Sequence, residues 1–430
     1  MKYQLLTLLC IFAVNGTTIA ADDTQTRLRA MEAEINGIFK LKGTGESYLS
    51  ENCPKQLAFW LQAAEQGYTI AQYLLSGCFY RGKGIAKDEA LAVAWLHKAA
   101  EQGYAAAQNN LGGMYLQGTG IAKDEVEAIA WYRKAAEQGD AAAQKNLGLM
   151  YLQGTGIAKD EAQAVAWFRK AAEQGYADAQ NSLGVMYLKG IGIAKDIAQA
   201  VAWFRKAAEQ GYAGAQLNLG NMYSQGKGIA KDGAQAVIWY SKAAEQGQAD
   251  AQNFLAGMYL EGTGIAKDEA LAVVWFRKAA EQGVAVAQYN LGVMYLHGTG
   301  IAKDEVQAVA WFRKAAEQRY ARAQYNLGVM YLEGTGIAKD VAQAVTWFRK
   351  AAEQGLADAQ NNLGVMYFKG IGIAKDEALA VAWLSKAAKQ GQANAQYNLG
   401  LMRFLGKTMP KQWHGFAKPP NNRMLLNNTI

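Results

Sequence analysis

Ser224 and Lys227, three positions apart, have the spacing that could support covalent catalysis. In β-lactamase-like enzymes a Ser-x-x-Lys string lies on a helix, and Ser-Asp-Asn and Lys-Thr-Gly strings bring further groups to the nucleophile. Neither companion string occurs here, and the segment 224–227 straddles a predicted helix end and a glycine turn. We therefore interpret the match as chance and predict a non-enzymatic protein without a catalytic residue.

The histidines and the glycine-rich loops offer no better site. His97, His297 and His414 stand at three different positions of the sequence pattern, and no set of cysteines or carboxylates completes a ligand group around them. Loops of the form G-x-G-I-A-K resemble phosphate cradles, but no predicted strand precedes them and the Gly-Lys-Ser/Thr ending is missing. We predict neither a metal site nor a cofactor.

Residues 1–20 have the features of a secretory signal peptide. Lys2 precedes an apolar run over 5–14, which is too short to span a bilayer. We expect cleavage after residue 20 or 21, and export to the periplasm or the extracellular space. Acylation at Cys10 is the alternative, but Leu9 occupies a position where a lipoprotein signal needs a small residue. No transmembrane segment is expected in the mature protein.

The elements that would position any site come from a 36-residue repeat. Its best-preserved stretch, 154–175, reads GTGIAKDEAQAVAWFRKAAEQG. The tryptophan of this stretch recurs without insertion or deletion at Trp95, Trp131, Trp167, Trp203, Trp239, Trp275, Trp311, Trp347 and Trp383. A fixed period of this size is typical of stacked supersecondary units that share a continuous core.

Each unit is predicted to contain two helices. In the unit after residue 175, apolar or small residues recur at helical spacing before and after a turn. Gly190 and Gly192 suit a turn that needs positive φ. Asp196 is the predicted N-cap of the second helix, and Gln199 would complete a capping box with it. Gly211 is the predicted left-handed C-cap.

Small and aromatic residues are expected to share the packing between helices. A mid-helix glycine such as Gly184 costs about 1 kcal/mol against alanine, so its recurrence implies a close approach of helices. Tyr187 and Trp203 are expected to fill the gaps between neighbouring units. Ala256 replaces this glycine once, and Arg319 replaces the C-cap glycine once. We expect both replacements to loosen the array locally.

This pattern resembles the Sel-one-like repeat family, which is related to tetratricopeptide repeats. The resemblance covers roughly residues 32–406 and rests on A-x-A-Q-x-x-L-G-x-M-Y-x-x-G-x-G-I-A-K-D followed by A-x-x-W-x-x-K-A-A-x-Q-G. It implies an all-α fold, a right-handed α-solenoid (superhelix) of antiparallel helix pairs with a concave binding surface. It also implies an adaptor role in protein complexes, although the fold alone does not fix which role.

The repeat divides the chain into five segments. They are the signal peptide at 1–20, an N-terminal segment with a degenerate capping repeat at 21–67, nine repeats at 68–391, a half repeat at 392–406 and a basic tail at 407–430. In the capping copy, residues 43–45 match the turn between helices, and residues 52–54 match the start of a second helix. Atypical first units are expected to act as caps.

Cys53 and Cys78 fall at the same edge of the predicted stack. Cys53 aligns with the start of a second helix and Cys78 with the end of a first helix. A disulfide between the first two units is therefore geometrically reasonable, and it would suit an exported protein. Two unpaired thiols are the alternative that the sequence leaves open.

The net charge of +7 is concentrated at the C-terminal end. From residue 378 onwards the sequence has no acidic residue and these basic ones: Lys386, Lys389, Arg403, Lys407, Lys411, Lys418 and Arg423. The array before them is neutral, whereas nucleic-acid binding favours a basic stripe along the body. We expect no nucleic-acid partner. An anionic envelope surface could bind the basic end, and a solubilising end is the alternative.

Variable positions beside the constant frame are the predicted contact surface. The two positions after the constant glutamine of each first helix are mostly Asn or Tyr, and we call them the Asn/Tyr ladder. Asn offers a donor and an acceptor to a peptide backbone, and Tyr offers rigid contact area. The predicted partner-binding residues are Asn146, Asn181, Asn218, Tyr289, Asn290, Tyr325, Asn326, Asn362 and Tyr397. The alternative is that these residues bridge neighbouring units and bind nothing.

Together these features predict a monomeric protein-interaction scaffold, exported to the bacterial envelope, that binds a protein or peptide partner on its concave face. A secreted protein that binds host molecules is the first alternative. A β-lactamase-like enzyme or a cell-wall hydrolase is less favoured, because the sequence supplies no convincing nucleophile.

Overall fold

The computed structural model describes residues 26, 30 and 44–405. The predicted signal peptide, Cys10, His414 and the basic tail at 407–430 lie outside these residues. Twenty helices and no strand occur in the described part of the chain, and none of these helices is both long and apolar enough to cross a membrane. Their bounds are α3 Thr44–Glu65, α4 Thr69–Arg81, α5 Glu89–Glu101, α6 Ala105–Gln117, α7 Glu125–Glu137, α8 Ala141–Gln153, α9 Glu161–Glu173, α10 Ala177–Lys189, α11 Ile197–Glu209, α12 Ala213–Gln225, α13 Gly233–Glu245, α14 Ala249–Glu261, α15 Glu269–Glu281, α16 Ala285–His297, α17 Glu305–Glu317, α18 Ala321–Glu333, α19 Val341–Glu353, α20 Ala357–Lys369, α21 Glu377–Lys389 and α22 Ala393–Leu405.

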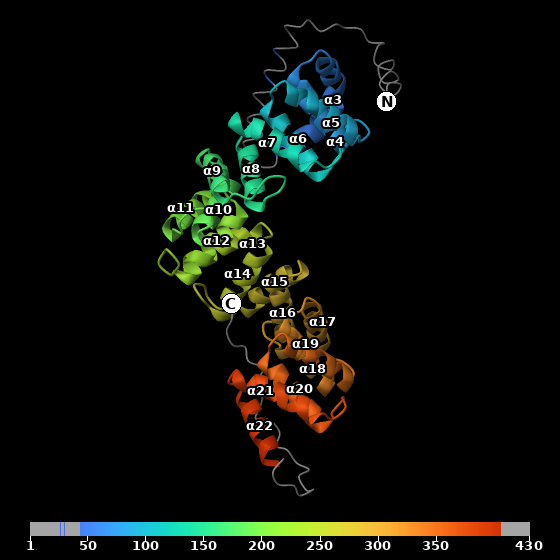
Figure 1. The fold of residues 1–430 in the computed structure, drawn as a ribbon, viewed down its shortest axis with the longest axis vertical. Helices are drawn as coiled ribbons and strands as arrows, with labels where there is room; N and C mark the ends of the chain where they lie inside the picture. Colours follow the sequence, from blue (N-terminus) through green and yellow to red (C-terminus); the bar gives the residue numbers. More distant parts are fainter. Residues whose placement is uncertain (1–25, 27–29, 31–43, 406–430) are drawn as a thin grey trace. The chain divides into compact units, whose positions relative to one another are not determined.

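The chain forms two compact units, Met1–Ala207 and Ala208–Ile430. Within each unit, successive helices pack against one another in pairs, and each pair packs against the next (Figure 1). The pairs repeat with the period of the sequence, so that α8 and α10 begin 36 residues apart, at Ala141 and Ala177. The prediction of an all-α solenoid of helix pairs is therefore confirmed.

Glycines shape the loop between the two helices of a pair. Gly190 follows α10 with a φ of 72°, and Gly192 has a φ of 66°. A side chain at Gly192 would also collide with the backbone carbonyl of Glu161, at the start of the preceding second helix. Both the left-handed conformation and the lack of space therefore require glycine.

An aspartate caps each of the second helices from α5 to α21, as predicted, but the capping box is incomplete. The Asp196 carboxylate accepts a hydrogen bond from the backbone N–H of Gln199 at 3.0 Å. The backbone N–H of Asp196 donates to the carbonyl of Tyr187 at 3.0 Å, so it is not available to the Gln199 side chain. The prediction of a reciprocal box is wrong because this bond instead ties the second helix to the end of the first.

The core of each pair lies where the first helix meets the second. Phe204 of α11 is fully buried, and a Cβ atom on Gly184 would come within 2.7 Å of its ring. The glycine therefore permits the predicted close approach of the helices. Trp203 is only half-buried, so the deepest aromatic residue is the one that follows the repeated tryptophan.

Arg319 keeps the backbone conformation of the glycine that it replaces. Its φ of 66° makes it the one non-glycine residue with a positive φ in the described part of the chain. Its N–H donates to the carbonyl of Ala316 at 3.0 Å, as the N–H of Gly355 does to Ala352 in the next unit. The helix end is thus retained, with a side chain in a conformation that favours glycine.

The N-terminal end differs from the predicted helix pair. α3 runs without a break from Thr44 to Glu65, so the expectations of a turn at 43–45 and of a helix start at 52–54 are wrong for the residues described. The physical reason is that this copy lacks the G-I-A-K-D loop sequence, and helical residues take its place. Pro54 lies inside α3, where it cannot donate a helical hydrogen bond.

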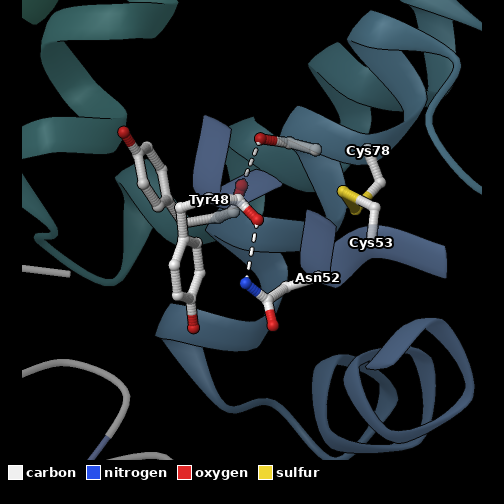
Figure 2. The surroundings of a disulfide bond; sticks show 6 residues. Tyr48, Asn52, Cys53 and Cys78 are labelled. Atoms are coloured by element: carbon white, nitrogen blue, oxygen red, sulfur yellow. Dashed lines mark hydrogen bonds between the residues drawn. A yellow bond between two sulfur atoms is a disulfide. The ribbon is translucent and has the colours of Figure 1, made fainter. Parts of the chain in front are cut away.

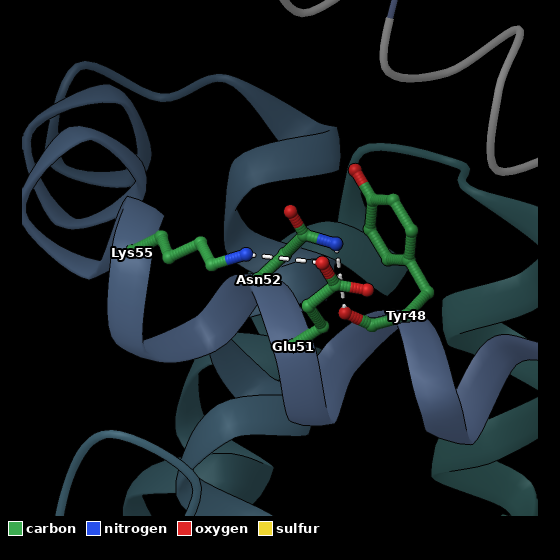
Figure 3. A network of polar contacts seen from close by, with 4 residues as sticks. All are labelled: Tyr48, Glu51, Asn52 and Lys55. Atoms are coloured by element: carbon green, nitrogen blue, oxygen red, sulfur yellow. Dashed lines mark hydrogen bonds and ion pairs between the residues drawn. The ribbon is translucent and has the colours of Figure 1, made fainter.

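At the position of the aspartate cap of the other units, polar side chains of α3 make bonds within the helix. Asn52, at the position of the cap, donates through Nδ2 to the carbonyl of Tyr48 at 3.0 Å (Figure 3). Lys55 and Glu51 form an exposed ion pair one helical turn apart, with 3.0 Å between Nζ and Oε1. An exposed pair of this kind contributes only about 0.3 to 0.5 kcal/mol.

A disulfide joins α3 to α4. Cys53 and Cys78 are both fully buried, and their Cα atoms lie 5.7 Å apart (Figure 2). This is the pairing that the repeat alignment made reasonable. It links the first described helix to its neighbour at the end of the array, where a unit has fewer contacts to hold it.

Candidate partner-binding surface

The predicted contact residues lie on first helices. They occur on α8, α10, α12, α16, α18, α20 and α22. Most of them are half-buried, whereas Asn326 is buried and Tyr397 is 66 % exposed. A half-buried side chain can contact a neighbouring unit with one part and a partner with another.

Asn side chains of the ladder bridge neighbouring units. In each bridge the Nδ2 atom of one Asn donates to a ladder residue 37 positions earlier, on the preceding first helix. The bridges are Asn110 to Tyr73 Oη at 3.2 Å, Asn146 to Asn109 Oδ1 at 2.9 Å and Asn398 to Asn361 Oδ1 at 2.9 Å. These residues therefore bridge neighbouring units, as the first part of the alternative expected. Since an Asn side chain has two donor hydrogens and an oxygen with two lone pairs, a single bridge does not use all of its hydrogen-bonding capacity.

Tyrosines of the ladder combine ring packing with a hydrogen bond. The ring centroid of Tyr325 lies 5.6 Å from that of Phe348, and the hydroxyl hydrogen-bonds to Asn362 in the next unit. Tyr289 makes the same kind of bond to Asn326. Burial raises the pKa of Tyr325 to about 12, so this hydroxyl stays protonated at neutral pH.

One pair of ladder asparagines in the described part of the chain, Asn253 and Asn290, is not bridged. Asn253 is buried, and its Oδ1 atom has no hydrogen-bond partner. Asn290, which is placed to donate to it from the next first helix, makes no such bond. A buried acceptor without a donor costs about 1 to 3 kcal/mol. The pair Asn253 and Asn290 is therefore the place where the ladder is least satisfied by its own residues.

A second set of polar residues, whose role was not predicted from the sequence, connects neighbouring units inside the array. Gln288, the constant glutamine before the ladder, is buried. Its Nε2 atom donates to the carbonyl of Ala280 at 3.0 Å, and its Oε1 atom accepts from Gln318 at 2.8 Å. We call this arrangement the glutamine relay. The same two bonds are made by Gln72, Gln108, Gln144, Gln216, Gln252, Gln324 and Gln360.

Cations cover the aromatic residues of the second helices. Each repeated tryptophan from Trp95 to Trp383 has the Nζ atom of the lysine three positions later above its ring, 3.9–4.4 Å from the ring centroid. Arg169 donates through Nη2 to the hydroxyl of Tyr187 at 3.1 Å, and other units repeat this bond. These aromatic residues therefore belong to the framework of the array.

The serine and lysine considered for catalysis do not share a helix face. Ser224 lies in the last turn of α12 and hydrogen-bonds to the Tyr240 hydroxyl. Lys227 follows Gly226, whose left-handed conformation turns the chain away from the helix. The Ser-x-x-Lys string is thus part of a helix end, in agreement with its interpretation as a chance match.

The described histidines are also apart from one another. The Nδ1 atom of His97 lies 3.3 Å from Glu101 Oε1 within α5, and His297 is the last residue of α16. Among residues 26, 30 and 44–405, no group of three or more His, Cys, Asp or Glu is arranged to hold a metal ion.

A hollow of about 440 Å³ lies beside Arg319 in the second unit. Its lining includes two basic side chains, Arg319 and Lys350, and two acidic ones, Glu317 and Glu353. Because the charges of opposite sign balance one another, the lining shows no preference for an anionic or a cationic group.

Comparisons with known proteins identify the type of repeat in this chain. The model of the Sel1 repeat matches nine consecutive copies from 69–104 to 357–392, and a shorter copy at 393–412. A protective antigen with an SLR fold, present in uropathogenic Escherichia coli strains, is 36% identical over 93% of this chain and 86% of that chain, with a TM-score of 0.72. A Sel1 repeat protein from Oxalobacter formigenes is 38% identical over 72% of this chain and 90% of that chain, with a TM-score of 0.57. No curated protein sequence matches the chain.

Proposed function

We propose that this chain, which belongs to the Sel1 repeat family, is a non-enzymatic scaffold that acts as a monomer in the bacterial envelope and binds a protein or peptide partner through its Asn/Tyr ladder. Sel1 repeat proteins serve as protein-interaction scaffolds. Family membership supports the general role, and the ladder is our proposal for the surface that performs it.

The observation that carries the proposal is that the ladder is oriented by bonds between units while much of it stays half-exposed. Asn109 holds Asn146, and Asn362 holds the hydroxyl of Tyr325. Side chains that are already held in place lose little freedom when a partner binds, so their contacts contribute more to affinity. The constant glutamines from Gln72 to Gln360, by contrast, are buried and use their polar atoms within the array.

Affinity capture with two matched double variants tests this surface. Tyr289→Phe with Tyr325→Phe removes two ladder hydroxyls and keeps both rings. Tyr295→Phe with Tyr331→Phe removes two half-buried hydroxyls outside the ladder, each of which accepts a hydrogen bond from an arginine. The partner would be captured from extracts of the native host, identified by mass spectrometry, purified and titrated against each protein.

We expect the ladder variant to bind the purified partner about tenfold or more weakly, and the control variant to bind like the parent protein. Both variants lose two hydrogen bonds, each worth about 0.5 to 1.5 kcal/mol, so their melting temperatures should fall by similar amounts. Equal loss of binding in both variants would show that stability, rather than the ladder, controls capture.

Export is the second part of the proposal. The Cys53–Cys78 disulfide supports it, because disulfides persist in oxidising compartments and are rare in the cytosol. The signal-like sequence of residues 1–20 also supports it. Fractionation of the native host should place the protein in the periplasm or the medium, with the disulfide intact in a non-reducing peptide map. A reduced protein in the cytosol would contradict export.

A secreted protein that binds host molecules is a second candidate. It is favoured by the 36% identity, over 93% of this chain, to a protein described as a protective antigen. Such a protein would use the same ladder but would be accessible from outside the cell. Protease treatment of intact cells, with a periplasmic protein as the control, separates the two candidates.

A further inference from the structure

The C-terminal end of the array exposes apolar side chains that are covered in the inner units. α22 is a first helix, and no second helix follows it in the described part of the chain. Val381 of α21 is 40 % exposed, whereas Val345, at the same position one unit earlier, is 4 % exposed. The last unit of a repeat array normally presents a polar outer face, so an apolar one indicates a binding surface.

Gly400 leaves an open space in this face, which we call the notch. In the inner units the equivalent glycine contacts a large side chain of the following helix. A Cβ atom on Gly328 would lie 2.9 Å from the ring of Phe348, and one on Gly364 would lie 2.8 Å from Leu384. Around Gly400, no neighbouring residue of the described part of the chain lies within 4 Å of such a Cβ atom. The notch therefore fits one large apolar side chain presented by a helix.

Gln396 adds to the same face a side-chain oxygen that accepts no hydrogen bond from the described residues. Gln360, the equivalent residue one unit earlier, accepts a hydrogen bond from Gln390 at 2.9 Å. Gln396 keeps its own bond to the carbonyl of Ala388 at 3.2 Å, but no described residue donates to its Oε1 atom. We call Val381, Gln396 and Gly400 the end face. In the inner units, a single second helix supplies the contacts that the end face lacks.

The charge around the end face favours an acidic occupant. Lys389 stands where the preceding unit has Glu353, and residues 378–402 contain two lysines and no acidic residue. The chain's own residues 406–430 carry four basic residues and no acidic one, so their charge does not complement that of the end face. An acidic helix from another protein meets both the shape and the charge of the face.

We propose that the end face binds an acidic amphipathic helix of a partner protein, in the position that one more second helix would occupy. Two adjacent large apolar residues of that helix would lie over Val381 and in the notch at Gly400. This inference rests on the proposed scaffold function and gives it a second surface, apart from the bridged residues of the ladder.

A peptide with the sequence of α7 and its caps, residues 124–138, tests the proposal. It reads DEVEAIAWYRKAAEQ, is acidic overall, and carries the adjacent Trp and Tyr that the face would accept. The fluorescent, end-blocked peptide would be titrated with the full exported protein and followed by anisotropy. We expect saturable binding, which Gly400→Leu and Val381→Asp each weaken about tenfold or more. Binding should also weaken as salt rises.

Val274→Asp is the matched control, because Val274 is 43 % exposed on α15 and lies outside the end face. It should bind the peptide like the parent protein. The ladder variant, Tyr289→Phe with Tyr325→Phe, should also bind it normally, so this test can fail or succeed independently of the proposed ladder function. Circular dichroism should show all variants folded, since a Cβ atom at Gly400 meets no neighbouring residue that the structure describes.

Several outcomes would overturn the proposal. They are the absence of saturable binding, binding of a scrambled peptide with equal affinity, and an equal effect of Val274→Asp. Binding that appears only after residues 407–430 are removed would identify the chain's own tail as the occupant. Self-association that Val381→Asp abolishes would identify a second copy instead.

Discussion

Replacing Gln288 with leucine would break the glutamine relay at one boundary between units. Leucine has a similar size and a similar helix propensity, so the change removes hydrogen bonds with little effect on the helix itself. Two bonds are lost, from Nε2 to the carbonyl of Ala280 and from Gln318 to Oε1. Each such bond contributes about 0.5 to 1.5 kcal/mol to stability.

The two groups that lose Gln288 as a hydrogen-bond partner limit the loss of stability. The carbonyl of Ala280 still accepts from the N–H of Gly283 at 3.1 Å, and the side chain of Gln318 is exposed and can bind water. No buried group is therefore left without a partner, and the loss is confined to the two bonds. We expect the free energy of unfolding to fall by about 1 to 3 kcal/mol, which corresponds to a factor of about 5 to 160 in the local opening equilibrium.

Gln396→Leu is the matched control. Gln396 is exposed at the end of the array and keeps one bond, to the carbonyl of Ala388. Its replacement should cost less than about 0.5 kcal/mol, the range of ordinary surface substitutions.

Amide hydrogen exchange is the suitable assay because a repeat array need not unfold in one step. In Gln288→Leu, exchange should accelerate in α16 and α17 about 5- to 160-fold, and α3 and α4 should be unaffected. The reasoning is refuted if Gln396→Leu costs as much as Gln288→Leu, or if the acceleration is spread evenly over the chain.

Three further predictions concern other parts of the framework. Arg319 and Gly355 both have a left-handed backbone conformation, which favours glycine. In urea unfolding, Arg319→Gly should therefore stabilise the protein by about 0.5 kcal/mol, and Gly355→Ala should destabilise it by about 0.5 to 1 kcal/mol. Effects of the same sign would refute this. Replacing Cys53 and Cys78 by alanine should lower the free energy of unfolding by about 3.5 kcal/mol, since the two cysteines are 25 residues apart. Hydrogen exchange in α3 should also accelerate. Unchanged exchange in α3 would count against this prediction. The contribution of the buried tyrosines to stability should be constant up to about pH 10, the pKa of a tyrosine in the unfolded chain. It should fall between about pH 10 and pH 12, because the unfolded state ionises first. Urea midpoints that rose between about pH 10 and pH 12 would contradict this. The tyrosines whose pKa is raised by burial to about 12 are Tyr132, Tyr240 and Tyr325.

Much of the fold could be predicted because local chemistry and repeat period agree. Asp196 as an N-cap and the left-handed Gly190 and Gly192 follow from backbone needs that residue type alone reveals. The capping box failed because a bond from the Asp196 N–H to Tyr187 connects two helices, and a contact of this kind is invisible in a local motif. α3 was missed because the helix start expected at 52–54 depended on alignment to a copy that lacks the loop sequence.

The candidate surface was found only in part from the sequence. Variation among otherwise constant copies pointed to the ladder, but the bridges between Asn109 and Asn146 depend on the stacking of first helices. The glutamine relay could have been predicted from the sequence. Glutamines equivalent to Gln288 and Gln318, 30 positions apart, recur with the repeat. The end face could not be predicted at all, because it consists of contacts that the last unit lacks.

The central claim is that the first-helix ladder binds the partner while the repeated residues only build the array. Hydrogen exchange of the protein alone and in complex with its purified partner tests this most directly. The account predicts slower exchange in α16, α18 and α20, which carry Tyr289, Tyr325 and Asn362. Protection confined to the second helices α15, α17 and α19, or no change in any first helix, would contradict it.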